Sequence, residues 1–272
     1  MSRSSRKRLA AVVRDPNADL AEAALLCATE SNPDLDVDVA LLRLDAFADD
    51  LRTRGFPLSD AAAQAAALSG YLHGRQGFTG DTDDYHDPRN SLLDHVLARK
   101  RGLPITLSIV YVAVAHRLDA SAFGIGLPGH FVTGIGDPDR PIVLDPFHDG
   151  RAVDHTDLAA LLERSTGGRA PFRTSMLRPE PPPRVIRRLL DNLTRDQVTR
   201  GDVNGALRTI ELKQLLPVTV PEDLRLYGEL LIQTGRYREA ATVLDEYIAR
   251  APTPDDAEAA RVIARRARAK LN

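Results

Sequence analysis

The sequence predicts an α+β domain with a helical N-terminal layer and a small antiparallel sheet, followed by an all-α array. Three observations support this fold class. The first hundred residues are rich in Ala and Leu at helical spacing, short β-branched segments broken by glycines follow between residues 121 and 147, and the last ninety residues repeat a helical pattern.

Composition limits the kinds of protein this chain can be. It has 272 residues, enough for one or two domains with their own cores, and a net charge of −2, which favours neither nucleic acid nor membrane as a partner. One cysteine excludes a disulfide framework. There is no run of eighteen apolar residues, and the apolar part of the basic start is too short for a signal peptide, so we expect a cytoplasmic protein.

Helical spacing predicts three helices in the N-terminal layer, over residues 19–30, 38–55 and 57–74. Gly55 is a helix stop, and Ser59 or Asp60 can cap the third helix. Residues 75–91 are rich in Gly, Asp and polar side chains. They predict a long loop, and loops of this length often carry function.

A second helical pair and a sheet follow this loop. Residues 92–102 predict a helix, and 104–118 are apolar almost all round, which is typical of a buried helix with Pro104 in its first turn. Residues 121–127, 130–136 and 141–147 predict strands of an antiparallel sheet, with a "DPDR" turn joining the last two. Residues 154–166 predict another helix.

The proline-rich stretch "RPEPPPR", residues 178–184, is expected to be stiff and extended and to separate two domains. The predicted domains are residues 1–177 and 184–272.

The second domain contains an internal repeat with a period of 34 residues. The matched pairs are Gly201 and Gly235, Ala206 and Ala240, Ile210 and Leu244, Leu193 and Tyr227, and Leu190 and Leu224. Paired helices at this period predict a tetratricopeptide-like array of two copies, capped by a final helix over 254–271, although generic helical hairpins are the alternative. Such arrays bind peptides or partner helices, so we expect a protein or peptide partner there.

A histidine and an aspartate mark the candidate site in the first domain. His130 opens one predicted strand and Asp145 closes the next, and in an antiparallel hairpin those two ends lie side by side. A histidine oriented by a carboxylate can act as a general base. Alternatively, the pair has no catalytic role and only stabilises the hairpin.

Three blocks carry a family resemblance: "DPRNSLLDHVLARKRGLPITLSIVYVAVAHRL", "LPGHFVTGI" and "VLDPFHDG". Over residues 20–260 the chain resembles a bacterial family of transglutaminase-like proteins with C-terminal tetratricopeptide repeats, the SirB family, whose members are often labelled regulators of sir gene expression. The resemblance implies a papain-like α+β core. In that core a buried helix begins with the catalytic cysteine, and the histidine and aspartate come from adjacent strands.

The resemblance assigns His130 and Asp145 to the family histidine and aspartate. Transglutaminase domains read Gly-x-Cys at the start of the buried helix, where this chain reads Gly102-Leu103-Pro104. The nucleophile position is therefore Pro104, which has neither thiol nor hydroxyl, and thiol acyl transfer is not expected.

Three other residues could substitute for the missing nucleophile. Cys27 is the one thiol and is expected to be a buried structural residue of the helix over 19–30. Thr106 and Ser108 lie in the first turns of the buried helix, with Thr106 nearer the helix start. We expect them to cap or pack.

Histidines also raise the question of a metal. His86, Asp87, His130, Asp145 and His148 could converge, but they lack the i, i+4 spacing that indicates zinc, so we expect no metal and no cofactor. The expected ligand-binding residues of the cleft are Tyr85, His86, Asn90, Thr106 and His148. Asn90 or Ser91 could instead cap the helix that follows.

The function predicted from the sequence is a non-enzymatic binding or regulatory protein with a degenerate transglutaminase-like cleft. The alternative is a hydrolase or acyl transferase in which His130 and Asp145 activate water or a hydroxyl. A purely structural role of the pair is the third possibility.

Overall fold

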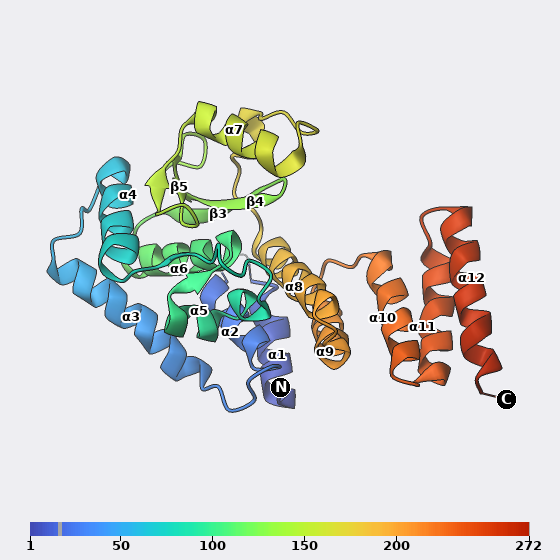
Figure 1. Ribbon diagram of the computed structural model, residues 1–272. Helices are drawn as coiled ribbons and strands as arrows, with labels where there is room; N and C mark the ends of the chain where they lie inside the picture. Colours follow the sequence, from blue (N-terminus) through green and yellow to red (C-terminus); the bar gives the residue numbers. More distant parts are fainter. Residues whose placement is uncertain (16–17, 272) are drawn as a thin grey trace. The chain divides into compact units, whose positions relative to one another are not determined.

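The computed structural model describes residues 1–15 and 18–271, which form two compact units over residues 1–189 and 190–272 (Figure 1). Helix α8, Pro182–Thr199, runs across the boundary between them.

Among the residues that the structure describes, six α-helices come before the main sheet in unit 1. They are α1 (Arg3–Val12), α2 (Leu20–Ala28), α3 (Val37–Thr53), α4 (Ala61–Ser69), α5 (Leu93–Arg99) and α6 (Pro104–Arg117). Aspartate side chains accept hydrogen bonds from the first free N–H groups of α2, α3 and α4, which explains where these helices begin. The predicted helices are confirmed with shorter bounds, and α1 lies in the basic start, where we predicted no element.

The main sheet has four antiparallel strands in the order β3-β4-β5-β6. Their bounds are β3 Ala122–Leu127, β4 His130–Ile135, β5 Ile142–Asp145 and β6 Arg151–Ala152. The first three are the predicted strands, so the α+β class is confirmed. Most residues of these three strands are buried, as expected for a sheet that is covered on both faces.

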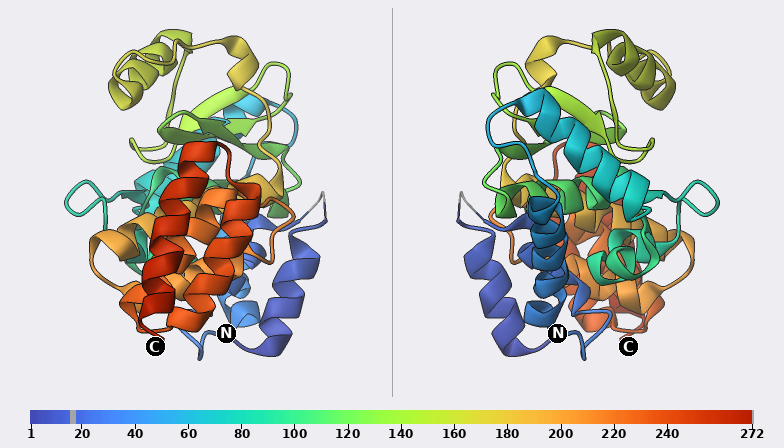
Figure 2. Two further views of the ribbon diagram at one scale, coloured as in Figure 1. Left: turned by 90° about the vertical axis from the view of Figure 1, so that its right-hand side faces the viewer. Right: turned by 90° about the vertical axis from the view of Figure 1, so that its left-hand side faces the viewer.

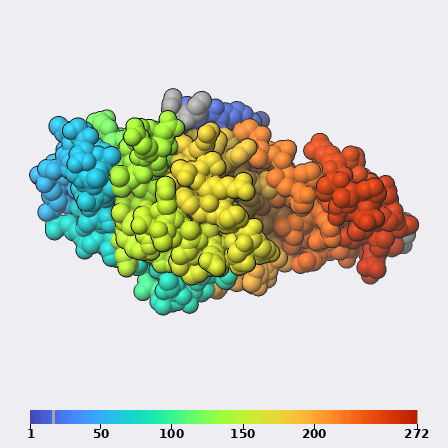
Figure 3. Space-filling view, turned by 90° about the horizontal axis from the view of Figure 1, so that it is seen from above, coloured from blue at the N-terminus to red at the C-terminus, as the bar shows by residue number. Residues whose placement is uncertain are grey.

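Helices cover both faces of this sheet. Helix α6 packs against β3 and β4, and every residue from 104 to 115 is buried, as its uniform apolar sequence predicts. Helix α7 (His155–Thr166) packs over the opposite face through a shared leucine-rich core, while α4 lies beside the strands (Figure 2). Seen from above, the yellow-green and yellow residues that include α7 cover this side of the unit (Figure 3).

A second, parallel strand pair lies partly in the segment that we predicted as a loop. Strand β1 (Thr79–Gly80) pairs with β2 (Arg101–Gly102), just before α6 begins. Short helical turns flank it: a π-helical turn η1 (Gly70–Arg75), and 3₁₀ turns η2 (Pro88–Ser91) and, later in the chain, η3 (Thr174–Met176). Two-residue strands carry no readable period, so the sequence pattern cannot predict them.

The proline-rich stretch at 178–184 does not remain extended to its end. Pro182 begins α8, because proline at the first helical positions loses no hydrogen bond and already has a helical φ. The division between the compact units falls within α8, between Leu189 and Leu190, and not in the proline stretch itself.

Unit 2 contains the rest of α8, followed by α9 (Val203–Lys213), α10 (Pro221–Gln233), α11 (Tyr237–Arg250) and α12 (Pro254–Ala269). Helices α10, α11 and α12 pack in sequence, and α11 and α12 lie side by side (Figure 2, orange to red). Gly201 and Gly235 both adopt positive φ, +74° and +75°, in the turns before α9 and α11. Ala206 and Ala240 are both fully buried in these helices.

In the part of the chain that the structure describes, no helix is both long and apolar enough to span a bilayer.

Candidate functional site

His130 is held at the end of a tight hairpin. It is the first residue of β4 and pairs with Leu127, the last residue of β3. Gly129 in the connecting turn has φ +72°, a conformation that glycine adopts without strain. The turn therefore presents His130, which is buried, at the end of the sheet.

Asp145 meets His130 from the neighbouring strand. It is the last residue of β5, is fully buried, and its Oδ2 lies 3.1 Å from Nε2 of His130. The predicted His130–Asp145 contact is confirmed. Burial alone would raise the pKa of Asp145, but the hydrogen bonds from His130 and His148 outweigh it and hold that pKa well below its ordinary value.

His148 joins the same carboxylate. Its Nδ1 lies 2.7 Å from Oδ2 of Asp145, while Oδ1 accepts the backbone N–H groups of Phe147 and His148 at 3.1 and 3.3 Å. The hydrogen bond to Asp145 raises the pKa of His148. We call His130, Asp145 and His148 the His–Asp–His cluster.

Aromatic rings wall this cluster. The ring of Phe147 packs edge-on against both imidazoles, with centroids 6.2 Å from His130 and 5.1 Å from His148. Tyr85 packs on Phe147 at 5.7 Å and on His86 at 5.3 Å. Tyr85 and His86, predicted from the long loop, thus lie beside the cluster with His86 exposed. Phe147 was not predicted, although it follows Asp145 in the "VLDPF" block.

The start of α6 is tied to the same place. The N–H of Gly80 donates to the carbonyl of Phe147 at 3.2 Å, and Gly80 pairs with Gly102 in the β1–β2 ribbon. A Cβ on Gly80 would lie 2.6 Å from the Phe147 ring, so only glycine allows this approach. Pro104 begins α6 two residues after Gly102. The N-terminus of the buried helix is therefore connected, through two hydrogen-bonded steps, to the wall of the cluster.

A histidine and an aspartate from adjacent strands, with a buried helix whose N-terminus connects to the wall of that pair, match the arrangement expected from the resemblance. The family model described as "Transglutaminase-like superfamily" matches residues 39–191. The chain belongs to this superfamily. The SirB name has no such support and stays a prediction.

Relatives extend the match beyond the transglutaminase-like region. A UPF0162 protein of Xylella fastidiosa is 31% identical over 254 residues, covering 92% of this chain and 90% of the relative. A UPF0162 protein of Pseudomonas aeruginosa is 33% identical over 207 residues, 74% of each chain. Among solved structures, menin covers 95% of this chain and 69% of its own at 14% identity, with a TM-score of 0.43, too low to support a conclusion.

Within the transglutaminase-like unit, the candidate hydroxyls are not available for attack. Thr106 is fully buried, and its single hydroxyl proton is shared between the carbonyls of Asn90, at 2.8 Å, and Leu103, at 3.0 Å. Ser108, two residues further along α6, is also fully buried. Both side chains pack inside the unit, as expected.

Asn90 holds the long loop together. It is fully buried, donates from Nδ2 to the carbonyl of Asp84 at 2.8 Å, and accepts from Arg99 at 3.0 Å. Arg99 also binds Asp81 at 2.8 Å, and the Asn90 carbonyl receives the Thr106 hydroxyl. Of the expected ligand-binding residues, Asn90 and Thr106 therefore lie in an internal network, whereas Tyr85, His86 and His148 reach the surface of the cluster.

Cys27 lies in α2 and is 3% exposed. Burial raises the pKa of its thiol to about 12, which leaves very little thiolate at neutral pH. The predicted burial of Cys27 is confirmed.

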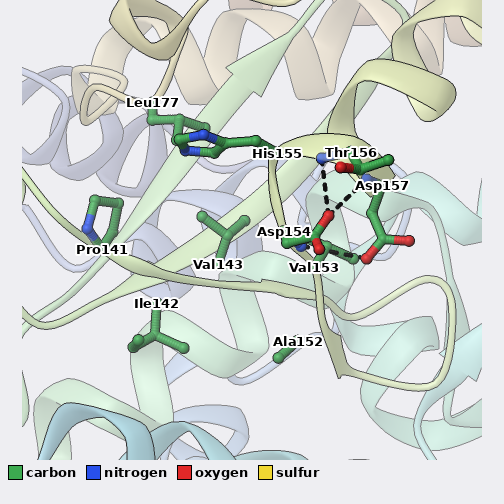
Figure 4. Close-up of a pocket in the computed structure, with 10 residues that line it drawn as sticks. All are labelled: Pro141, Ile142, Val143, Ala152, Val153, Asp154, His155, Thr156, Asp157 and Leu177. Atoms are coloured by element: carbon green, nitrogen blue, oxygen red, sulfur yellow. Dashed lines mark hydrogen bonds between the residues drawn. The ribbon is translucent and has the colours of Figure 1, made fainter.

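A separate cavity of about 610 Å³ opens beside β5, β6 and the start of α7 (Figure 4). Polar groups that line it already hydrogen-bond to one another. Asp154 accepts the N–H groups of Thr156 and Asp157 at 2.8 and 2.9 Å, and the Asp157 carboxylate accepts the N–H of Asp154 at 3.2 Å. This capping box uses the helix donors that would otherwise bind an anion.

Three of the five residues weighed as metal ligands do converge. One donor atom from each member of the His–Asp–His cluster lies within 4.8 Å of the other two. Arg188 was not singled out in the sequence, yet its guanidinium donates to the backbone carbonyls of Leu127 and His130 and so supports the site from outside. A helical arginine after a proline stretch gives no sequence signal for that contact.

Proposed function

We propose that this transglutaminase-like chain is a non-enzymatic binding or regulatory protein whose degenerate cleft recognises a peptide or small polar ligand. The single observation that supports the proposal is Pro104 at the first position of α6. Acyl transfer on this scaffold needs a nucleophile at that helix terminus, where backbone N–H groups and the helix dipole stabilise the thiolate and the oxyanion. Proline supplies no nucleophile and removes one N–H group.

The residues that could replace the thiol support the same view. Thr106, Ser108 and Cys27 are all buried. The thiol of Cys27 also has a raised pKa, and the Thr106 hydroxyl already donates its proton. A covalent intermediate would require one of these groups to leave a packed interior.

The side chains around the His–Asp–His cluster suit recognition instead of covalent chemistry. His148 is half-exposed and packs on Phe147, and the exposed His86 packs on the half-buried phenol of Tyr85. These side chains combine imidazole donors and acceptors with aromatic faces. Such a combination fits the amide and carboxylate groups of a peptide.

We further propose that unit 2 holds a protein partner through tetratricopeptide-like repeats. The matched glycines both have positive φ and the matched alanines are both buried, as two equivalent helix pairs would require. A cavity of about 370 Å³ in this unit is lined by residues of α9, α10 and α11, among them Lys213, Tyr227 and Arg250. A regulatory role of the kind named for the SirB family is part of this proposal.

The second candidate function is hydrolysis with water as the nucleophile. The observation in its favour is the 3.1 Å His130–Asp145 hydrogen bond, because a histidine held by an ionised carboxylate can take a proton from water. Without a covalent nucleophile, only the residual acceleration of binding and oxyanion stabilisation remains, about 10³–10⁴ over water in the best-studied triad.

The enzymatic test incubates the purified protein with an amide donor and an amine acceptor, and separately with an electrophilic thiol trap. We expect neither amine incorporation nor a covalent adduct. Time-dependent incorporation that disappears in His130→Ala would contradict the non-enzymatic proposal, and ammonia release without amine incorporation would favour the hydrolase.

The binding test records imidazole signals by ¹H–¹⁵N NMR while glutamine- and aspartate-containing dipeptides are titrated in, with a chelator present. We expect saturable shifts for His148 and His130, and none for His155, an exposed histidine outside the cluster. If the folded protein binds none of these dipeptides, the proposal of peptide recognition is contradicted.

A further inference from the structure

We propose that the His–Asp–His cluster is a binding site for a first-row divalent cation, with Zn²⁺ as its occupant. Nε2 of His130, Oδ2 of Asp145 and Nδ1 of His148 lie within 4.8 Å of one another, and no other such group occurs among residues 1–15 and 18–271. This inference reaches beyond the proposed function, because metal binding at the cluster does not require the cleft to bind a peptide.

The donor set selects the metal class. Two imidazole nitrogens and one carboxylate oxygen are typical ligands of zinc and its first-row neighbours. Magnesium and calcium prefer sites made of oxygen alone. Because His130 and His148 supply nitrogen, the cluster favours Zn²⁺ over the hard cations.

The donor spacing is close to what a metal requires. The two nitrogens lie 3.1 and 2.7 Å from Oδ2 of Asp145 as hydrogen-bonded pairs. Ligands bound at about 2.0–2.2 Å in a tetrahedron are about 3.4 Å apart. An opening of about 0.3 Å for the His130 pair and about 0.7 Å for the His148 pair, together with loss of the bridging protons, would therefore convert the hydrogen-bonded cluster into a coordination site.

The buried members of the cluster are pre-oriented. Oδ1 of Asp145 is fixed by the backbone N–H groups of Phe147 and His148, which leaves Oδ2 to face the imidazoles. Arg188 fixes the strand end at His130 through its carbonyl. Supporting contacts of this kind typically change metal affinity by 10- to 100-fold when they are removed.

His148 provides both a ligand and an entry path. Its side chain is 48% exposed, whereas that of His130 is 8% exposed and that of Asp145 fully buried. Three protein ligands leave a fourth position for water or for an oxygen atom of a ligand. That position would face the exposed side, beside His148.

Two arginines oppose a cation here. Arg151 and Arg164 act electrostatically to lower the pKa of His148, against the larger effect of Asp145. A bound Zn²⁺ would feel the same repulsion. The ionised Asp145, whose pKa is lowered, supplies the compensating negative charge at the centre of the cluster.

The test titrates Zn²⁺ into full-length, chelator-stripped protein by isothermal calorimetry. We expect one equivalent per chain, with affinity reduced at least about tenfold in His148→Ala and in Asp145→Asn. His148 is half-exposed, so its alanine variant should fold, which circular dichroism checks. His155→Ala removes an exposed histidine outside the cluster and should bind Zn²⁺ as the wild type does.

X-ray absorption at the zinc edge supplies an independent readout, with two imidazole ligands expected. Absence of binding by folded wild-type protein would overturn the proposal, as would equal binding by His148→Ala. The peptide titration is run with chelator present, so failure of the metal site and failure of peptide recognition are separate results.

Discussion

The guanidinium of Arg188 donates from Nη2 to the backbone carbonyls of Leu127 and His130, both at 2.8 Å. These two residues form the terminal pair of the β3–β4 hairpin. The same guanidinium lies over the ring of Phe131, 5.4 Å from its centroid. Helix α8 therefore fixes the strand end from which the candidate site is built.

Replacing Arg188 by alanine should loosen this hairpin. Arg188→Ala removes two hydrogen bonds from a charged donor and a cation–π contact, so we expect the free energy of unfolding to fall by about 1–3 kcal/mol. Urea unfolding followed by circular dichroism measures the change. Arg184→Ala is the matched control, because Arg184 is an exposed residue of the same helix and its loss should change stability little. Equal effects of the two variants would mean that the contacts of Arg188 with the β3–β4 hairpin do not stabilise the protein.

The pairing of His148 with Asp145 should make stability depend on pH. The hydrogen bond to Asp145 raises the pKa of His148 above its ordinary 6.5. The stabilisation is then complete below about pH 6.5 and is lost as pH rises through the raised pKa. Asp145 has a lowered pKa, so its own contribution is lost only in strong acid.

Urea midpoints of wild type and His148→Gln, compared from pH 5 to pH 9 with chelator present, check this dependence. The difference between the two proteins should shrink above neutrality and stay below about 1 kcal/mol, because His148 is half-exposed. A difference that grows with pH would mean that the imidazole is stabilised in its neutral form.

We expect Asn90 to stabilise the fold and not to bind a ligand. Asn90→Ala removes the hydrogen bond to the carbonyl of Asp84 and the one from the guanidinium of Arg99, although Asp84 keeps the N–H of Asp87 and Arg99 keeps Asp81. We expect a loss of about 1–3 kcal/mol, the usual range for losing buried hydrogen bonds of which one has a charged donor. Thr82→Ala, at an exposed residue of the same loop, tests whether any change in this segment is equally harmful. Unchanged stability in Asn90→Ala would return Asn90 to the ligand-binding residues.

Thiol reactivity can compare the native Cys27 with a cysteine introduced at position 104. Cys27 should react slowly with iodoacetamide at pH 7 and quickly in denaturant, because burial raises its pKa to about 12. In Pro104→Cys on a Cys27→Ala background, the new thiol begins a helix beside the His–Asp–His cluster. We expect faster alkylation there, since helix N-termini lower thiol pKa values.

His130→Ala in that same background is the deciding control. Alkylation that slows when the imidazole is removed would mean that the remaining cleft keeps catalytic geometry around position 104. Alkylation that is equally fast without His130 would mean that the helix terminus alone activates the thiol and that the two elements no longer cooperate.

The sequence determined the elements whose signals are local or periodic. The apolar run at 104–115 specified a buried helix, and two β-branched segments, one beginning at His130 and one ending at Asp145, specified strands that bring these two residues together. The antiparallel order of consecutive strands made this pair predictable, because the end of one strand then lies beside the start of the strand it pairs with. The absence of a nucleophile at Pro104 is likewise a property of the sequence itself.

The tertiary structure decided the contacts that no period encodes. Three contacts are visible only in the folded structure. His148 binds the same carboxylate of Asp145 as His130, the ring of Phe147 packs against Gly80, and Arg188 donates to the β3–β4 hairpin. It also placed Asn90 and Thr106 inside a closed network. The physical reason is that side-chain contacts between segments distant along the chain depend on how packed elements converge, whereas helices and strands follow the spacing of apolar residues along the chain.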